Sequence, residues 1–208
     1  MPGWEMCLIL ALNIFKMKKF ILLILIIGIV SCKGSKNSAT SNIDLFAVEN
    51  LAVMNSEDIG KNYTDTNIQE DIGMFEEGTE ERPYTTLYSG TPDEIQITWA
   101  NPQRSKIYDI RFTGDGRWKS QTGIKVGTSY EELNQINGKK VSFYGFGWDY
   151  SGAVMWNDGK LEDSKIFVFL SPNNSAEGNK FYGDHIIQAT PEEIAALNLR
   201  VSTILYKL

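Results

Sequence analysis

Three aromatic residues and one carboxylate lie together in a short segment of the chain. The segment runs from Gly145 to Gly152 and contains Phe146, Trp148, Asp149 and Tyr150. Aromatic rings offer flat faces for stacking on a sugar ring or a peptide side chain, and a neighbouring carboxylate can orient the ligand. On an extended strand, alternation would place the three rings on one side. These four residues form the candidate binding surface, although a strand end followed by a hairpin turn would explain the same glycines.

The single histidine, His185, does not fit a catalytic pattern. It follows Asp184, but no serine in the chain lies in the glycine-framed turn that exposes a hydrolase nucleophile. A zinc site would need further histidine or cysteine ligands. The carboxylates near turns do not follow the spacing of a calcium loop; they are Asp115, Asp158, Glu162 and Asp163. We predict no catalytic residue, metal or cofactor, and keep one enzymatic alternative, a hydrolase with paired carboxylates such as Asp149 and Asp184.

The N-terminal region has the three parts of an export signal. Lys18 and Lys19 form a basic start, an apolar run follows from residue 20 to residue 30, and Ser31 and Cys32 come next. A membrane-spanning helix needs about 20 consecutive apolar residues, so this run is too short to be one. Residues 29–32, Ile-Val-Ser-Cys, resemble the lipobox of a bacterial lipoprotein. The resemblance implies cleavage between Ser31 and Cys32 and a lipid on the Cys32 sulfur. Residues 1–31 are therefore the predicted signal peptide, with Met17 as the expected start and residues 1–16 as an extension from a misplaced start codon.

The exported chain that follows from this signal is acidic and has no reactive thiol. The full sequence has two cysteines. Cys7 leaves with the signal peptide, and the thiol of Cys32 becomes a thioether when the lipid is attached. The whole chain has a formal net charge of −6, and residues 1–31 carry a net +2, so the mature chain carries −8. This charge argues against nucleic-acid binding, which depends on lysine and arginine at phosphates. Residues 32–42 are the predicted lipidated cysteine and flexible tether, which place the protein at the bacterial cell envelope, on the outer membrane.

Residues 43–208 are predicted to form a single globular α+β domain, in which short helices pack on an antiparallel β-sheet. Capping boxes mark helix starts at residues 55–58, 129–132 and 190–193. Alternating or continuous apolar runs predict strands at 94–99, 108–112, 141–148, 153–156, 166–170 and 199–205. The order of these elements suggests two tandem helix-plus-sheet repeats, residues 43–118 and 119–208.

The apolar faces of these elements predict the core. The run 166–170 is apolar throughout, which is typical of a strand covered on both faces. Large apolar residues on the predicted inner faces should be buried and in mutual contact; they are Trp99, Phe112, Leu133, Phe143, Phe167 and Val201.

Two resemblances concern the exported domain. The helix start after Val126-Gly127-Thr128-Ser129, with the strands that follow, resembles small envelope-assembly lipoproteins and the tandem-repeat fold of β-lactamase inhibitory protein. A second set of motifs is similar to an uncharacterised family of Gram-negative envelope lipoproteins; it comprises Phe75-Glu76-Glu77-Gly78, Asp93-Glu94-Ile95, Ile97, Trp99, Gly123-Ile124, Val126-Gly127-Thr128, Leu133, Asn137-Gly138, Gly145-Phe146-Gly147, Asp149 and Gly152. The second resemblance implies a common fold and an envelope location, and it implies no catalytic residues.

Together these features favour a non-catalytic lipoprotein that binds an envelope protein or a glycan, or that serves assembly. Two alternatives remain open from the residues. One is an inhibitor of a secreted hydrolase, which would present an aromatic or acidic loop to its target. The other is the carboxylate-dependent hydrolase described above.

Overall fold

The computed structural model describes residues 43–176 and 178–208 of the 208-residue chain. The predicted signal peptide, its cleavage site between Ser31 and Cys32, the lipid attachment at Cys32 and the tether all lie outside the described residues. Ile43–Leu208 forms one compact unit. Within the described ranges, no helix is long and apolar enough to cross a membrane.

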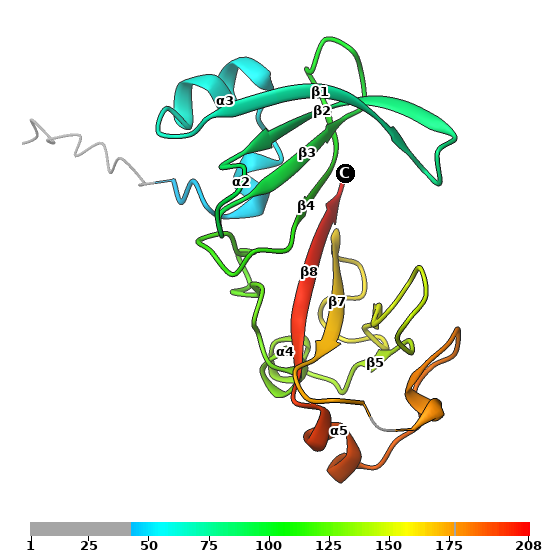
Figure 1. Cartoon of the computed structure of the whole chain (residues 1–208). Coiled ribbons are helices and arrows are strands. Elements are labelled where there is room, and N and C mark those ends of the chain that lie inside the picture. Colours follow the sequence, from blue (N-terminus) through cyan, green and yellow to red (C-terminus); the bar gives the residue numbers. More distant parts are fainter. Residues whose placement is uncertain (1–42, 177) are drawn as a thin grey trace, which may run out of the picture. The chain divides into compact units, whose positions relative to one another are not determined.

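The fold is α+β, as predicted, and its centre is a six-stranded antiparallel sheet (Figure 1). Its strands are β1 (Ile68–Phe75), β2 (Glu80–Leu87), β3 (Ile95–Trp99), β4 (Ile107–Phe112), β7 (Ile166–Pro172) and β8 (Leu199–Lys207). Their order across the sheet is β1-β2-β3-β4-β8-β7. Two short strands, β5 (Ser142–Phe143) and β6 (Val154–Met155), pair in a separate sheet.

The helices are short, and the predicted capping boxes start three of them. These are α3 (Ser56–Asn62), α4 (Tyr130–Asn137) and α5 (Pro191–Leu197). In each, the residue before the helix accepts a hydrogen bond from the third helical amide, and the side chain of that third residue accepts one from the cap, so two free amides are satisfied. Four elements were not predicted: α2 (Val48–Leu51), the 3₁₀ helix η1 (Asn179–Phe181) and the two strands β1 and β2.

The core lies between the helices and one face of the sheet. Trp99, Phe112, Leu133, Phe143 and Val201 are all buried and belong to one apolar cluster, as predicted. Trp99 is fully buried, and its indole Nε1 donates a hydrogen bond to Thr85 Oγ1 at 2.8 Å. The cluster holds β3, β4, β7 and β8 in place while leaving their other face outside the core.

Phe167 is the exception, and its prediction was wrong. The strand β7 buries only alternate residues, Ile166, Val168 and Leu170, so it is covered on one face and not on both. Phe167 points to the other face, where its side chain is 46% exposed and Lys207 Nζ lies 5.5 Å from the ring centre. A continuous apolar run therefore does not by itself identify a strand that is buried on both sides.

Two β-bulges also displace the predicted alternation. The first bulge is in β4, opposite β3. Thr98 of β3 pairs with Asp109, and Trp99 pairs with Ile107, so Tyr108 is an extra residue. Ile107 is therefore buried, whereas simple alternation from Ile110 would bury Tyr108. The second bulge is in β8, opposite β7. Phe169 of β7 pairs with Thr203, and Leu170 pairs with Val201, so Ser202 is the extra residue. An extra residue reverses which side chains face the core. Ile204 is consequently buried, whereas Thr203 and Leu205 face away from the core.

The two predicted halves join in a single sheet through the pairing of β4 with β8. The second half starts with the capped helix α4, as expected, whereas in the first half the uncapped helix α2 comes before the capped helix α3. The first half then forms four consecutive sheet strands, whereas in the second half β5 and β6 form their own sheet and α5 separates β7 from β8. The predicted strand 141–148 is reduced to Ser142–Phe143 because the chain turns after it.

Replacing Phe167 with alanine should lower the free energy of unfolding by about 1 kcal/mol or less. A fully buried aromatic would cost about 3–5 kcal/mol, but this ring is half exposed and its main charged contact is the distant Lys207 ammonium. Urea unfolding of the variant measures the difference. A loss above about 3 kcal/mol would show that Phe167 belongs to the core after all.

Candidate functional site

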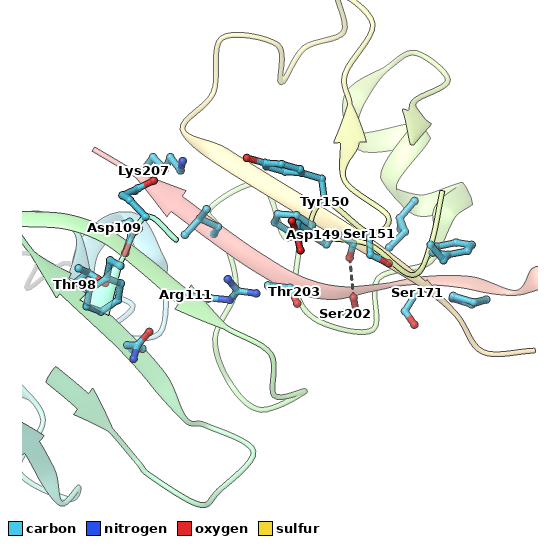
Figure 2. A pocket seen from close by; sticks show the side chains of 18 residues that line it. Thr98, Asp109, Arg111, Asp149, Tyr150, Ser151, Ser171, Ser202, Thr203 and Lys207 are labelled. Atoms are coloured by element: carbon cyan, nitrogen blue, oxygen red, sulfur yellow. Dashed lines mark hydrogen bonds between the residues drawn. The ribbon is translucent and has the colours of Figure 1, made fainter. Parts of the chain in front are cut away.

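The face of the sheet opposite the core carries a groove of about 590 Å³, which we call the sheet-face groove (Figure 2). Its floor comes from β3, β4, β7 and β8, and its sides come from the hairpin tip after β1 and from the segment Gly145–Gly152, which we call the groove loop. The lining residues used below are Glu76, Gln96, Thr98, Asp109, Arg111, Asp149, Tyr150, Phe169, Thr203, Leu205 and Lys207.

The pairing of β4 with β8 brings the charged part of the floor together. Asp109 pairs with Lys207 and Arg111 with Leu205, so these four side chains lie on one face of two neighbouring strands. Alternation places Ile110 and Phe112 on the opposite, buried face. Among the described residues, no salt bridge involves Asp109, Arg111 or Lys207. These charged groups therefore face the groove without an ion-pair partner.

The hairpin between β1 and β2 supplies one side of the groove. Its tip residue Glu76 accepts a hydrogen bond of 3.0 Å from the hydroxyl of Tyr108, the bulged residue of β4. The Arg82 guanidinium lies 3.9 Å from the centre of the Tyr108 ring. The bulge thus turns Tyr108 toward the hairpin, and its contacts hold the Glu76 carboxylate at the edge of the groove.

The groove loop supplies another side and is fixed by backbone contacts. Phe146 N donates to Phe181 O at 2.8 Å, and Leu170 N donates to Gly152 O at 2.8 Å. Gly152 has a φ of +71°, and a Cβ there would meet Leu170 O at 1.9 Å. Only glycine fits this position, because both the left-handed backbone and the contact with β7 exclude a side chain.

The four predicted surface residues separate into two pairs. Phe146 is buried and packs against Phe143, with ring centres 6.0 Å apart. Trp148 is half buried, and its Nε1 donates to Gly145 O at 2.8 Å. Asp149 and Tyr150 are exposed and line the groove, and Tyr150 is 56% exposed.

The expectation that Phe146, Trp148 and Tyr150 share one side of an extended strand was wrong. The segment turns at Gly147, which has a φ of +80°. Phe146 also lines the groove, but its ring belongs mainly to the core. The exposed ring that meets the groove is therefore Tyr150, and Trp148 supports the loop from within.

Asp184 and His185 do not line the sheet-face groove. They lie in the loop before Ile187, where His185 Nε2 is 3.0 Å from Lys180 O and His185 O accepts a hydrogen bond from Gly145 N. The groove therefore brings Asp149 together with Glu76 and Asp109, and not with Asp184. His185 helps to position the groove loop through its backbone.

The turn carboxylates are likewise placed apart from the groove. Asp158 N donates to Glu162 Oε2 at 3.0 Å, which is a local turn contact, and Asp115, Asp158, Glu162 and Asp163 do not line the groove. In the part of the chain that the structure describes, no three His, Cys, Asp or Glu side chains gather as metal ligands.

Asp109 carries a carboxyl group on the groove floor whose pKa is shifted by its surroundings. Partial burial raises its pKa above the usual range, and the nearby Glu76 carboxylate acts in the same direction. The Thr98 hydroxyl and the positive charges of Lys207 and Arg111 oppose this rise. A carboxyl group that resists ionisation on a polar floor can donate as well as accept a hydrogen bond.

The Asp109 carboxyl should make stability depend on pH. Because its pKa is raised in the folded chain, the unfolded chain releases this proton first, and stability falls as pH rises from the unfolded pKa through the folded pKa. Asp109→Asn should therefore be more stable than the wild type at pH 7 and equally stable at pH 3. Urea unfolding at both pH values measures this, with Asp149→Asn as the exposed control. An equal gain at pH 3 would contradict the argument.

Comparison with known proteins finds a distant likeness to a solved structure. No protein-family model matches the chain, and no curated protein matches it significantly. The crystal structure of the uncharacterized protein yfeY from Escherichia coli is similar, with a TM-score of 0.41 and 16% sequence identity over 68% of this chain and 82% of that chain. Because the neighbour is itself uncharacterized, it supplies no functional residue.

Proposed function

We propose that this protein is an exported lipoprotein of the cell envelope whose folded domain is a non-catalytic binding module. Its ligand, an envelope protein or a glycan, occupies the sheet-face groove. One observation carries the proposal. Asp149 and Tyr150 line the same groove as Arg111 of β4 and Lys207 of β8, whose charges have no ion-pair partner among the described residues. Clefts that combine an aromatic ring with a few placed polar groups are the usual form of a binding site.

The composition of the groove fits a large polar ligand. Tyr150 and Phe169 offer ring faces, and Gln96, Thr98 and Thr203 offer hydrogen-bonding groups beside Arg111 and Lys207. The floor lies on strands of the core sheet, so its geometry is fixed before a ligand arrives. A preformed site loses less entropy on binding than a mobile one.

The proposed location follows from the lipobox-like residues 29–32 and the acidic exported chain. A lipid on Cys32 would anchor the protein at the outer membrane, and the polar tether of residues 33–42 would allow the domain to reach a ligand away from the lipid surface. The same location is implied by the resemblance between the motifs of the domain and a family of envelope lipoproteins.

A carboxylate-dependent hydrolase is the second candidate, and one observation favours it. Glu76, Asp109 and Asp149 line the same groove, and the pKa of Asp109 is raised, as a general acid requires. If this candidate holds, Asp109→Asn would retain ligand binding and abolish turnover of a glycan or peptide substrate. A pure binding module would show no turnover in either form.

The binding proposal is tested by variants of the groove in the full anchored protein. Tyr150→Ala and Arg111→Ala should each reduce capture of the ligand about tenfold, because each removes a contact worth about 1.4 kcal/mol. Capture from detergent-solubilised envelopes reports a protein ligand, and cosedimentation with purified cell-wall glycan reports a glycan. His185→Ala is the control and should change neither. Capture that survives both groove variants and is lost in His185→Ala would overturn the proposal.

A further inference from the structure

The two edges of the six-stranded sheet differ in how they are covered. At the β7 edge, Leu170 N donates to Gly152 O at 2.8 Å and Ala153 forms a bridge with Phe169, so the groove loop covers part of the strand. At the other edge, within the described residues, β1 pairs with β2 alone (Figure 1). The outer side of β1 is thus a row of backbone groups without a neighbouring strand.

The open strand β1 lacks most of the features that protect an edge. It is eight residues long, its pairing with β2 is continuous from Ile68 to Phe75, and it contains no proline, lysine or bulge. Ile72 and Met74 are each 59% exposed, and Ile68 is 40% exposed. Natural proteins usually shorten, bend or charge such an edge, because it otherwise recruits another strand.

The outward backbone groups of β1 can be assigned from the hydrogen bonds. Ile72 pairs with Pro83, and the Ile72 N–H donates to Asp71 Oδ1 at 2.7 Å. In an antiparallel pair, alternate residues direct both backbone groups away from the partner strand. The outward set is therefore Glu70, Ile72 and Met74, and the Asp71 side chain satisfies one of its donors until another strand arrives.

Charge decides what kind of strand fits this edge. Residues 68–87 contain six carboxylates, Glu70, Asp71, Glu76, Glu77, Glu80 and Glu81, and one cation, Arg82. Arg82 already pairs with Glu80, and Arg104 pairs with Glu70 at 3.4 Å, so among the described residues Asp71, Glu76, Glu77 and Glu81 have no ion-pair partner. A second copy of the chain would bring two acidic hairpins together, and like charges on neighbouring strands are destabilising. A strand with lysine or arginine beside the carboxylates and apolar residues beside Ile72 and Met74 would match both features.

We propose that the outer edge of β1 is a docking site for an extended, positively charged segment of another protein, which adds a seventh strand to the sheet. The backbone groups of Glu70, Ile72 and Met74 would hold it, and the acidic hairpin would select its charge. This mode of recognition combines main-chain hydrogen bonds for affinity with side-chain contacts for specificity. Glu76 of the same hairpin borders the sheet-face groove, but Ile72 and Met74 do not line it, so variants at these two positions test the strand edge alone.

The test uses the full chain in detergent and two synthetic probes. One probe is a capped ten-residue peptide that alternates valine and lysine, and the other has glutamate in place of lysine. Amide hydrogen exchange at residues 68–75 is the measurement. We expect the lysine probe to slow exchange of the Ile72 and Met74 amides about tenfold or more at saturation, and the glutamate probe to have no effect.

Ile72→Pro removes one outward donor and leaves the pairing with β2, because proline is tolerated on an edge strand. It should abolish the protection of Met74 by the lysine probe. A proline variant can fail to fold, so a double variant with Ile72→Lys and Met74→Lys is made in parallel. This double variant should also lose the protection of its position-74 amide by the lysine probe. Val53→Lys is the control, because Val53 is 83% exposed and lies outside the sheet.

Three results would overturn the proposal. The lysine probe could bind without slowing exchange in β1. Exchange of the outward amides of Glu70, Ile72 and Met74 could be slow without any probe and independent of protein concentration, which would mean that the chain covers its own edge. Protection could instead rise with protein concentration alone, which would identify a second copy as the occupant.

Discussion

When Cys32 is replaced with serine, the membrane fraction is expected to contain almost none of the mature protein. The predicted lipid joins the chain through the Cys32 sulfur, and serine provides no sulfur. Each buried methylene contributes about 0.8 kcal/mol to anchoring, so the loss of a diacylglyceryl group removes the anchor rather than weakening it. Fractionation and immunoblotting of wild type and variant measure the distribution, and the variant should accumulate as uncleaved precursor or as mislocalised chain.

Mass spectrometry of the wild-type protein supplies the matching positive result. The mature chain should begin at Cys32 and carry the mass of an attached lipid. Cys7→Ser is the matched control, because Cys7 lies before the predicted cleavage site and its loss should leave processing unchanged. A wild-type chain that is soluble and unmodified at Cys32 would contradict the proposed anchoring.

Replacing Trp99 with alanine should lower the free energy of unfolding by about 3–5 kcal/mol. The side chain is fully buried at the end of β3, and its removal leaves a cavity among the residues of the apolar cluster. The Thr85 hydroxyl, which is itself buried, also loses the hydrogen bond from Trp99 Nε1. An unsatisfied buried polar group adds a cost of about 1–3 kcal/mol.

Urea unfolding monitored by circular dichroism measures the effect of Trp99→Ala. Phe167→Ala is the matched control, since it also removes an aromatic ring from a sheet strand but from the exposed face. A loss smaller than about 1 kcal/mol for Trp99→Ala, or equal losses for the two variants, would contradict the assignment of the core face.

The three capped helices and the fold class could be predicted from the sequence because their signals are local. Each capping box occupies four consecutive residues, as Ser129–Glu132 does, and needs no distant partner. The buried face of β3 could also be predicted, since Ile95, Ile97 and Trp99 alternate with polar residues without interruption. The errors arise where one strand depends on another. The bulges at Tyr108 and Ser202 are set by pairing, so alternation in a single strand cannot reveal them.

The candidate site was only half predictable for the same reason. Asp149 and Tyr150 belong to one short segment, and their composition identified them. The alternation of Asp109 and Arg111 with Ile110 and Phe112 indicates a polar face, which is a signal that could have found them. Their meeting with Lys207 required the pairing of β4 with β8, two strands far apart in the chain. Burial of Phe146 and the turn at Gly147 likewise follow from contacts with the Phe181 loop.

Photo-cross-linking from the groove in intact cells tests the central claim most directly. A benzophenone amino acid at position 150 of the full anchored protein replaces the exposed Tyr150 ring with a larger aromatic group, which reacts with C–H bonds of a bound protein or glycan. Position 53, where Val53 is 83% exposed, and position 185 serve as controls away from the groove. We predict one dominant adduct from position 150, reduced when Arg111 is also changed to alanine, and no such adduct from positions 53 and 185. The same adduct from a control position, or none from position 150, would contradict the assignment of the sheet-face groove as the binding site.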